Sequence, residues 1–400
     1  MKRALTLIAA LAFAAAPLLA QTELVVWHAY RGGEKQAFEK VVNKYNASQK
    51  KVKVSALAVP FDAFADKITA AVPRGKGPDI FIYAQDRLGG WIEAGNTVEP
   101  IDFYLDKATS AQYLPITMQA MVYRKTTYGL PLNYKMPAMI YNKALVKTPP
   151  KTTAELVAIA KKLTNAPAGQ FGLAYAYSDW YYHSALFNGF GGGVFDARGK
   201  PIVNNPANVQ ATALLLKWMY RDKILPLEPS TALITALFNS GKAAIIFNGP
   251  WFLGEISPKI QYGLALMPNI AEAGGKPMKP WVTVEGVFIA APSKHKDDAF
   301  DFAKYLTDTP AGKILAVEGR QNPANKAVYS DPQVASDPIL NAFRAQVDQA
   351  VPMPNVPEMT MMWSPCTTAM NAIVKRTATP KAALDAAQAK VVEAISKLKK

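Results

Sequence analysis

The sequence has few of the residues that build disulfides, metal centres and common catalytic sites. One cysteine, Cys366, stands in 400 residues, which excludes an internal disulfide and a cysteine-based metal site. The three histidines, His28, His183 and His295, lie far apart, and isolated histidines mostly serve unrelated local roles. We therefore predict no metal and no cofactor, and a fold that is stabilised by packing.

Familiar enzyme motifs are also missing. The chain contains no G-x-x-x-x-G-K-[ST], no G-x-S-x-G and no H-E-x-x-H, and the triple glycine at 191–193 follows aromatic residues instead of opening a dinucleotide site. We predict no catalytic residues and hence no enzyme. The carboxylate pair of a glycosidase has no fixed spacing in sequence, so a secreted carbohydrate-active enzyme stays an alternative.

Long hydrophobic runs are confined to the start of the chain. Lys2 and Arg3 precede an uncharged stretch, 4–20, that is mostly Ala and Leu. This pattern predicts a secretory signal peptide over residues 1–20. The alternative is a membrane anchor, but the stretch is short for a span. Gln21 stands where a lipid-anchored protein would have Cys, which favours a soluble protein in the periplasm.

Acidic residues are outnumbered, 30 against 45 Lys and Arg, for a formal charge of +15. Without Lys2 and Arg3 the charge is 15 − 2 = +13. The basic residues are scattered, and the longest cluster is only the run at 50–53. This distribution favours a solvated surface over a nucleic-acid site. A basic cleft would instead favour an anionic sugar. Nothing in the sequence indicates a stable oligomer.

Strand and helix patterns alternate along the remaining 380 residues, which is enough for two domains. Residues 24–27, 52–58 and 79–83 have strand patterns, and apolar residues recur at helical spacing over 38–45 and 61–71. The order strand-helix-strand-helix-strand predicts an α/β fold with a mostly parallel sheet flanked by helices.

Aromatic and polar residues gather where predicted strands end. Tyr83 to Arg87 follows one strand, Trp251 follows the strand at 243–247, and an aromatic run extends from Asp179 to His183. Open α/β sheets bind ligands beyond the carboxyl ends of their strands. A sugar ring has an apolar face that suits an aromatic platform and hydroxyls that suit carboxylates and Arg. Each aromatic taken alone is better explained by core packing, but their shared position after strand ends shifts the balance toward a sugar site.

At these segments the chain resembles the maltose/maltodextrin-binding proteins among family 1 extracellular solute-binding proteins. The motifs that carry the resemblance run in the family's order along nearly the whole chain. They are Gly77-Pro-Asp-Ile-Phe-Ile-Tyr-Ala-Gln-Asp-Arg-Leu-Gly-Gly90, Ile140-Tyr-Asn-Lys143, Phe238-Asn-Ser-Gly241, Asn248-Gly-Pro-Trp251, Met353-Pro-Asn-Val-Pro-Glu-Met359 and Trp363.

The resemblance implies a two-lobed periplasmic binding protein fold (type II) whose lobes are joined by a hinge of crossing segments. The first lobe would comprise residues 21–133 plus 282–324, and the second lobe residues 138–281 plus 325–400. An oligosaccharide of the maltodextrin type would bind between them, and the membrane permease of an ABC transporter would receive it. A different solute, such as a polyamine or a sugar phosphate, stays an alternative.

The same resemblance implies roles for single residues. Tyr83 matches an aromatic platform, and Asp86 and Arg87 match a pair that bonds sugar hydroxyls. Asp179 and Tyr181 match an acidic and an aromatic residue of the cleft. The two stacking tryptophans of the family correspond to Trp251 and Trp363.

The chain departs from the family pattern at three places, where the family has four charged residues. Tyr30 and Arg31 replace an Asp-Lys pair, Lys135 replaces a cleft Glu, and Thr367 stands where an Arg is usual. We expect Tyr30, Arg31 and Lys135 to face the ligand. They would add positive charge near the cleft, so a phosphorylated or acidic saccharide is an alternative ligand.

Overall fold

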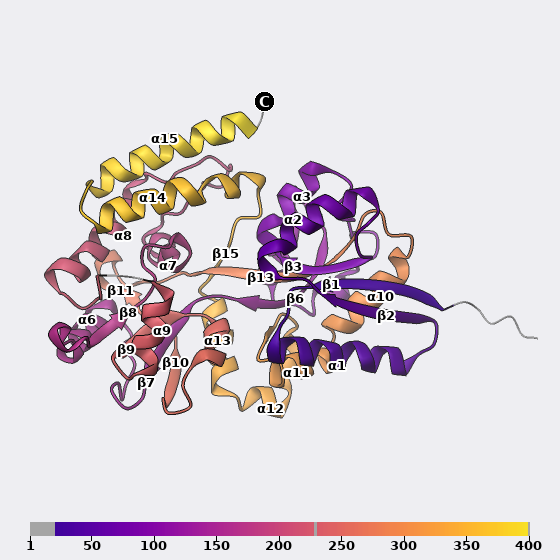
Figure 1. Cartoon of the computed structure of the whole chain (residues 1–400), viewed down its shortest axis with the longest axis horizontal. Coiled ribbons are helices and arrows are strands. Elements are labelled where there is room, and N and C mark those ends of the chain that lie inside the picture. Colours follow the sequence, from indigo (N-terminus) through magenta and orange to yellow (C-terminus); the bar gives the residue numbers. More distant parts are fainter. Residues whose placement is uncertain (1–20, 228–229, 399–400) are drawn as a thin grey trace, which may run out of the picture.

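A computed structural model describes residues 21–227 and 230–398, which form two lobes (Figure 1). The predicted signal peptide, residues 1–20, lies outside the described residues. Within them, no helix is long and apolar enough to span a bilayer. Each lobe is built around one main sheet with helices on its faces.

The first sheet has the strand order β14-β6-β13-β3-β1-β2, and β15 adds to β13 at its end. Its strands are β1 (Thr22–His28), β2 (Val52–Ala58), β3 (Ile80–Ala84), β6 (Gly129–Lys135), β13 (Trp281–Ile289), β14 (Asn322–Pro323) and β15 (Val351–Pro352). All five residues of β3 are buried. This matches a central strand whose sheet is covered on both faces.

The period of two residues along β3 divides its side chains between two hydrophobic cores. Ile80 and Ile82 pack in one core with Phe38, while Phe81 and Tyr83 pack in the other. The helices of this lobe are α1 (Gly32–Ser48), α2 (Phe61–Ala71), α3 (Leu88–Ala94), α4 (Lys107–Ser110), α5 (Pro115–Ala120), α10 (Lys296–Thr307) and α11 (Thr309–Val317).

The second sheet has the order β10-β7-β9-β8. Its strands are β7 (Ala138–Asn142), β8 (Phe171–Ala174), β9 (Ala243–Asn248) and β10 (Tyr262–Ala265). The helices between these strands are α6 (Thr153–Leu163), α7 (Trp180–Phe190), α8 (Pro206–Leu216) and α9 (Thr231–Asn239). Later in the chain, α12 (Pro332–Ala335) and α13 (Pro338–Val347) come before β15, and α14 (Trp363–Val374) and α15 (Pro380–Leu398) come after it. Two-residue ladders, β4 (Val122–Tyr123) with β5 (Thr126–Thr127) and β11 (Asn269–Ile270) with β12 (Lys276–Pro277), complete the strands.

Local sequence explains how α6 begins. The hydroxyl of Thr152 accepts a hydrogen bond from the backbone N–H of Glu155 at 3.2 Å, as an N-cap residue does. The Glu155 carboxylate accepts from the N–H of Lys151 at 2.7 Å. The pair resembles a capping box, except that the Glu155 carboxylate bonds the N–H of Lys151 instead of the N–H of the N-cap residue.

The prediction of mostly parallel sheets is wrong, because both sheets are mixed. β1 runs parallel to β2 and β3, but β13 is antiparallel to β3 and β6. In the second sheet only the pair of β8 and β9 is parallel. The reason is the path of the chain: β6 leads out of the first sheet, and β13 returns into it beside β6 in the opposite direction (Figure 1).

The segments between the lobes follow from this path. The chain crosses from β6 to β7, returns along β13, and runs once more past β15 toward α14. The lobe boundaries given above, 21–133 plus 282–324 and 138–281 plus 325–400, stay a prediction. The second sheet takes all its strands from the continuous stretch 138–265. The first sheet also includes β15, which the predicted boundaries assign to the second lobe.

Candidate functional site

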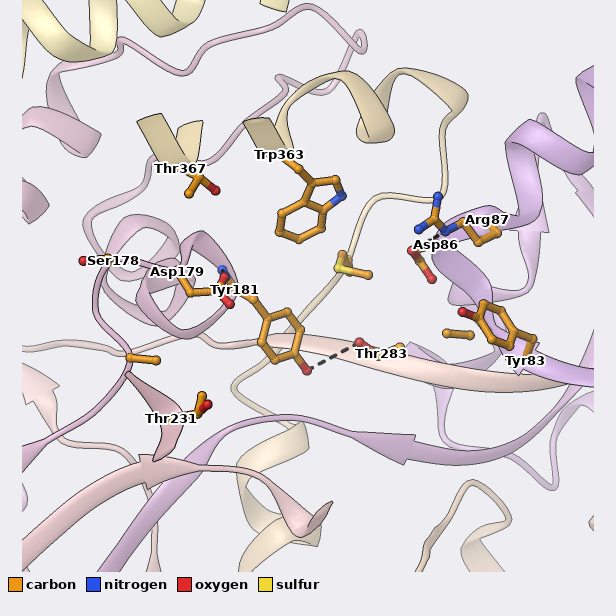
Figure 2. A pocket seen from close by; sticks show the side chains of 13 residues that line it. Tyr83, Asp86, Arg87, Ser178, Asp179, Tyr181, Thr231, Thr283, Trp363 and Thr367 are labelled. Atoms are coloured by element: carbon orange, nitrogen blue, oxygen red, sulfur yellow. Dashed lines mark hydrogen bonds and ion pairs between the residues drawn. The ribbon is translucent and has the colours of Figure 1, made fainter. Parts of the chain in front are cut away.

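A cavity of about 600 Å³ has walls from both lobes. Figure 2 shows Tyr83, Asp86 and Arg87 on one side and Asp179 and Tyr181 on the other, with Trp363 above. The complete lining is Tyr83, Ala84, Asp86, Arg87, Ala176, Ser178, Asp179, Tyr181, Thr231, Thr283, Met353, Trp363 and Thr367. Six of the residues predicted from sequence therefore meet in one cavity.

Tyr83 lies at the end of β3 with one face of its ring already covered. Phe64 stacks on it with ring centroids 4.9 Å apart and an interplanar angle of 6°. The side chain is 6% exposed, so it belongs to the core and contributes to the cavity wall at the same time. Tyr83 therefore fits both interpretations given above, because it packs in the core and also lines the cavity.

Asp86 and Arg87 follow directly in a short 3-10 turn, η2 (Gln85–Arg87). Their side chains form an ion pair, with Arg87 Nε 3.4 Å from Asp86 Oδ2. Burial raises the pKa of Asp86 to about 6, and the nearby Arg87 charge offsets only part of this effect. Arg87 Nε is itself buried and makes no hydrogen bond. Both residues line the cavity, where their remaining polar atoms can bond a hydroxyl group.

On the opposite wall, Asp179 caps α7. Its Oδ1 accepts a hydrogen bond from the N–H of Tyr181 at 2.8 Å, and burial raises the pKa of its carboxyl group. The hydroxyl of Tyr181 lies 3.4 Å from Thr283 Oγ1 on β13 (Figure 2). Ser178, just before the helix, has a buried Oγ without a hydrogen-bond partner. This wall therefore presents polar atoms with unused bonding capacity.

The two tryptophans differ in position. Trp363 begins α14, lines the cavity, and contacts Trp281 edge to face at 6.0 Å between centroids. Trp251 lies in the 3-10 segment η5 (Pro250–Glu255), is 39% exposed and does not line the cavity. Its ring packs against Tyr181 at 6.0 Å, so it stands next to the cavity instead of within it.

Tyr30 and Lys135 do not line the cavity either, and neither does Arg31. Tyr30 is buried and donates a hydrogen bond to Glu285 Oε2 at 2.9 Å. Lys135 Nζ lies 3.0 Å from Glu34 Oε1 and 3.1 Å from Glu285 Oε1. Burial alone would lower the pKa of Lys135, but the two carboxylates raise it overall. That these three residues contact a ligand stays a prediction.

The ion pairs correct one inference from the sequence. Lys135 was expected to add positive charge to the cleft, but Glu34 and Glu285 compensate its charge locally. The sequence could not show this, because the three residues come from α1, β6 and β13. Arg87 is likewise paired, with Asp86.

Sequence reasoning missed several lining residues. Thr283 and Met353 lie on the segments that return from the second lobe, and a residue on a crossing segment has no local signal for a site. Met353 at least opens the Met-Pro-Asn motif. Within the described residues, no group of three or more His, Cys, Asp or Glu side chains is placed to hold a metal ion.

Comparison with known proteins gives the class. The family described as bacterial extracellular solute-binding protein matches residues 31–313, and the chain belongs to this family. Its members bind solutes without transforming them, so this is a binding protein and not an enzyme.

Several individual relatives are named for the oligosaccharides that they bind. A maltotriose-binding protein of Pyrococcus abyssi is 31% identical over 88% of this chain and 78% of its own. A galactooligosaccharide-binding protein of Bacillus subtilis is 29% identical over 92% and 88%. Among solved structures, a cyclo/maltodextrin-binding protein complexed with maltotetraose superposes with a TM-score of 0.86 at 30% identity, covering 94% of this chain and 97% of that one.

Proposed function

We propose that this protein is the periplasmic solute-binding component of an ABC importer for a neutral, maltodextrin-type oligosaccharide. The observation that carries the proposal is the cavity itself. Three aromatic rings, Tyr83, Tyr181 and Trp363, share it with the Asp86–Arg87 pair and Asp179. Rings bury the apolar faces of sugars, and ionised groups bond the hydroxyls. The relatives with similar sequences, named for oligosaccharides, support the same class of ligand.

The charges favour a neutral sugar over an anionic one. An anionic ligand needs a cation that is free to bind it. Lys135 lies between two carboxylates, and Arg87 is paired with Asp86. The cavity also contains Asp179, which would repel a phosphate or a carboxylate.

The binding cycle requires no covalent chemistry. The sugar enters the open cleft, and contacts from both lobes then favour the closed form, which shifts the population toward it. Tyr83, Asp86 and Arg87 would bind from the first lobe, Asp179, Tyr181 and Trp363 from the second, and Trp251 would cover the edge of the bound sugar. The permease would receive the closed, loaded protein.

Calorimetric titration of the mature protein tests the proposal. Maltotriose and maltotetraose should bind with a dissociation constant in the micromolar range or below. A galactooligosaccharide and a maltose phosphate serve as the comparison ligands. Binding of the phosphate with no binding of the neutral sugars would reject a neutral ligand, and binding of the galactooligosaccharide alone would reject the maltodextrin class.

A further inference from the structure

Gln85 is fully buried, and its two neighbours in sequence, Ala84 and Asp86, line the cavity. Its Oε1 accepts a hydrogen bond from the backbone N–H of Val284 at 2.7 Å. Its Nε2 donates to the backbone carbonyl of Met353 at 3.1 Å, with the carbonyl of Val282 at 3.5 Å. One amide side chain thus bonds to two other segments of the backbone.

The three segments that Gln85 joins are all walls of the cavity. Gln85 itself lies between Ala84 and Asp86, which line the cavity. Val282 and Val284 flank Thr283, and Met353 lines the cavity directly. These segments are far apart in sequence: one is part of β13, and another follows β15 directly.

Further contacts anchor the Met353 segment to the same loop. The N–H of Gly89 donates to the carbonyl of Asn355 at 2.8 Å. A Cβ on Gly89 would come within 2.3 Å of that oxygen, so only glycine permits the approach. The Asn355 amide in turn donates to the carbonyls of Ala120 and Val122 at 3.2 and 2.8 Å. Hydrogen bonds at both Met353 and Asn355 therefore hold this segment to the first lobe, and Gln85 makes one of them.

We propose that Gln85 is a positioning residue of the binding site: its amide fixes the Asp86–Arg87 turn, Thr283 and Met353 relative to one another before the ligand arrives. The inference rests on the proposed function. Preformed walls reduce the ordering that binding would otherwise require, and this reduction appears as affinity. Gln85 touches no ligand in this account and acts through the residues that it holds.

A second buried glutamine provides a matched control. Gln346 on α13 is also fully buried, and its Oε1 accepts from the backbone N–H of Met267 at 2.7 Å. It does not line the cavity, and its bond joins no cavity wall. Gln85→Met and Gln346→Met each remove one buried amide of the same shape. Gln85→Met should lose more thermal stability than Gln346→Met. It leaves two backbone groups unpaired, whereas Gln346→Met leaves one and also removes a buried Nε2 that has no hydrogen-bond partner.

The experiment compares the two variants in two measurements. In calorimetric titration with maltotriose, Gln85→Met should bind at least tenfold more weakly than the wild-type protein, whereas Gln346→Met should bind within twofold of it. In hydrogen exchange of the ligand-free protein, Gln85→Met should exchange faster at 83–89, 282–284 and 353–357, and Gln346→Met should leave these segments unchanged. If Gln85→Met does not fold, Gln85→Asn replaces it, because the shorter amide cannot span both partners.

The results separate this inference from the proposed function. Equal affinity in the two variants, with a wild-type protein that binds maltotriose, would overturn the role of Gln85 and leave the function intact. If the wild-type protein binds no sugar, the proposed function fails, and hydrogen exchange alone decides the role of Gln85. Unchanged exchange at all three segments in Gln85→Met would overturn it in either case.

Discussion

The hydroxyl of Tyr181 lies 3.4 Å from Thr283 Oγ1, so a side chain on α7 of the second lobe contacts the strand that returns to the first. Both residues line the cavity, and the contact is long for an O–H···O hydrogen bond. Tyr181 is also within electrostatic range of Asp86 on the opposite wall. The contact therefore connects α7 with β13 at the cavity.

Tyr181→Phe tests this relationship. The change keeps the ring and removes the hydroxyl, so maltotriose should bind more weakly by about 1 kcal/mol, the typical value of one hydrogen bond. Titration calorimetry measures the loss, and the thermal midpoint of the ligand-free protein should stay nearly constant because the bond to Thr283 is weak. An affinity equal to that of the wild-type protein would place the ligand away from this hydroxyl.

Trp363→Ala should weaken maltotriose binding by about 1–3 kcal/mol, because it removes an aromatic surface that lines the cavity. Trp251→Ala should also weaken binding, within the same range but less, since its ring stands beside Tyr181 and is 39% exposed. Titration of both variants gives the order. A larger loss for Trp251→Ala would mean that Trp251 moves into the cavity when the sugar binds.

Asp86→Asn tests how much the burial of this carboxylate costs the stability of the ligand-free protein. The pKa of Asp86 is raised to about 6 by burial, so the folded protein holds this proton more tightly than the unfolded chain does. The wild-type protein therefore loses stability as pH rises from about 4 to 6, and the loss is complete above pH 6. At pH 8 the variant avoids the buried charge, and its thermal midpoint should rise by about 1 °C for each kcal/mol regained. A lower midpoint at pH 8 would show that the attraction of Arg87 outweighs burial.

Sugar binding should weaken in acid for the same reason. A hydroxyl donates to the ionised carboxylate of Asp86, so the ligand favours the deprotonated form. The affinity should be constant above pH 7 and should fall by up to about tenfold per pH unit below pH 6. Titrations from pH 5 to 8 measure this, and Asp86→Asn should abolish most of the dependence. A dependence that persists in Asp86→Asn would point to Asp179, whose pKa is also raised by burial.

Lys135→Met should destabilise the protein by about 1–3 kcal/mol, because it leaves Glu34 and Glu285 facing each other without the cation between them. Burial already raises the pKa of Glu34, and loss of the Lys135 charge removes an effect that lowers it, so the variant's stability should recover as the pH falls. Denaturant unfolding at pH 5 and pH 8 measures both effects. Affinity for maltotriose should change less than threefold, and a tenfold loss would bring Lys135 back as a ligand contact.

Much of the site could be predicted where its residues follow a strand. Tyr83, Asp86 and Arg87 were found because β3 has a clear buried pattern and ligands bind beyond strand ends. Thr283 could not be found in this way, because its place in the cavity depends on β13 pairing with strands more than a hundred residues earlier. The direction of β13 escaped prediction for the same reason, and with it the mixed character of the first sheet.

Charges and orientations were the hardest features to predict. The sequence shows Lys135 but not that Glu34 and Glu285 would meet it, since partners from other elements leave no local pattern. Likewise the sequence places Trp251 after a strand, yet its ring packs beside Tyr181 outside the cavity. The sequence did not indicate a role for Gln85, because its amide bonds only to backbone atoms and such bonds leave no pattern in the sequence.

The location of β13 between β3 and β6 has a consequence for biosynthesis. The first sheet cannot close until residues 281–289 have left the ribosome, although most of its other strands are made within the first 135 residues. A nascent chain of two hundred residues still lacks the strand that joins its two halves. Such a chain stays without the ladders of β13 with β3 and β6 for most of translation, so the first sheet is completed late in synthesis.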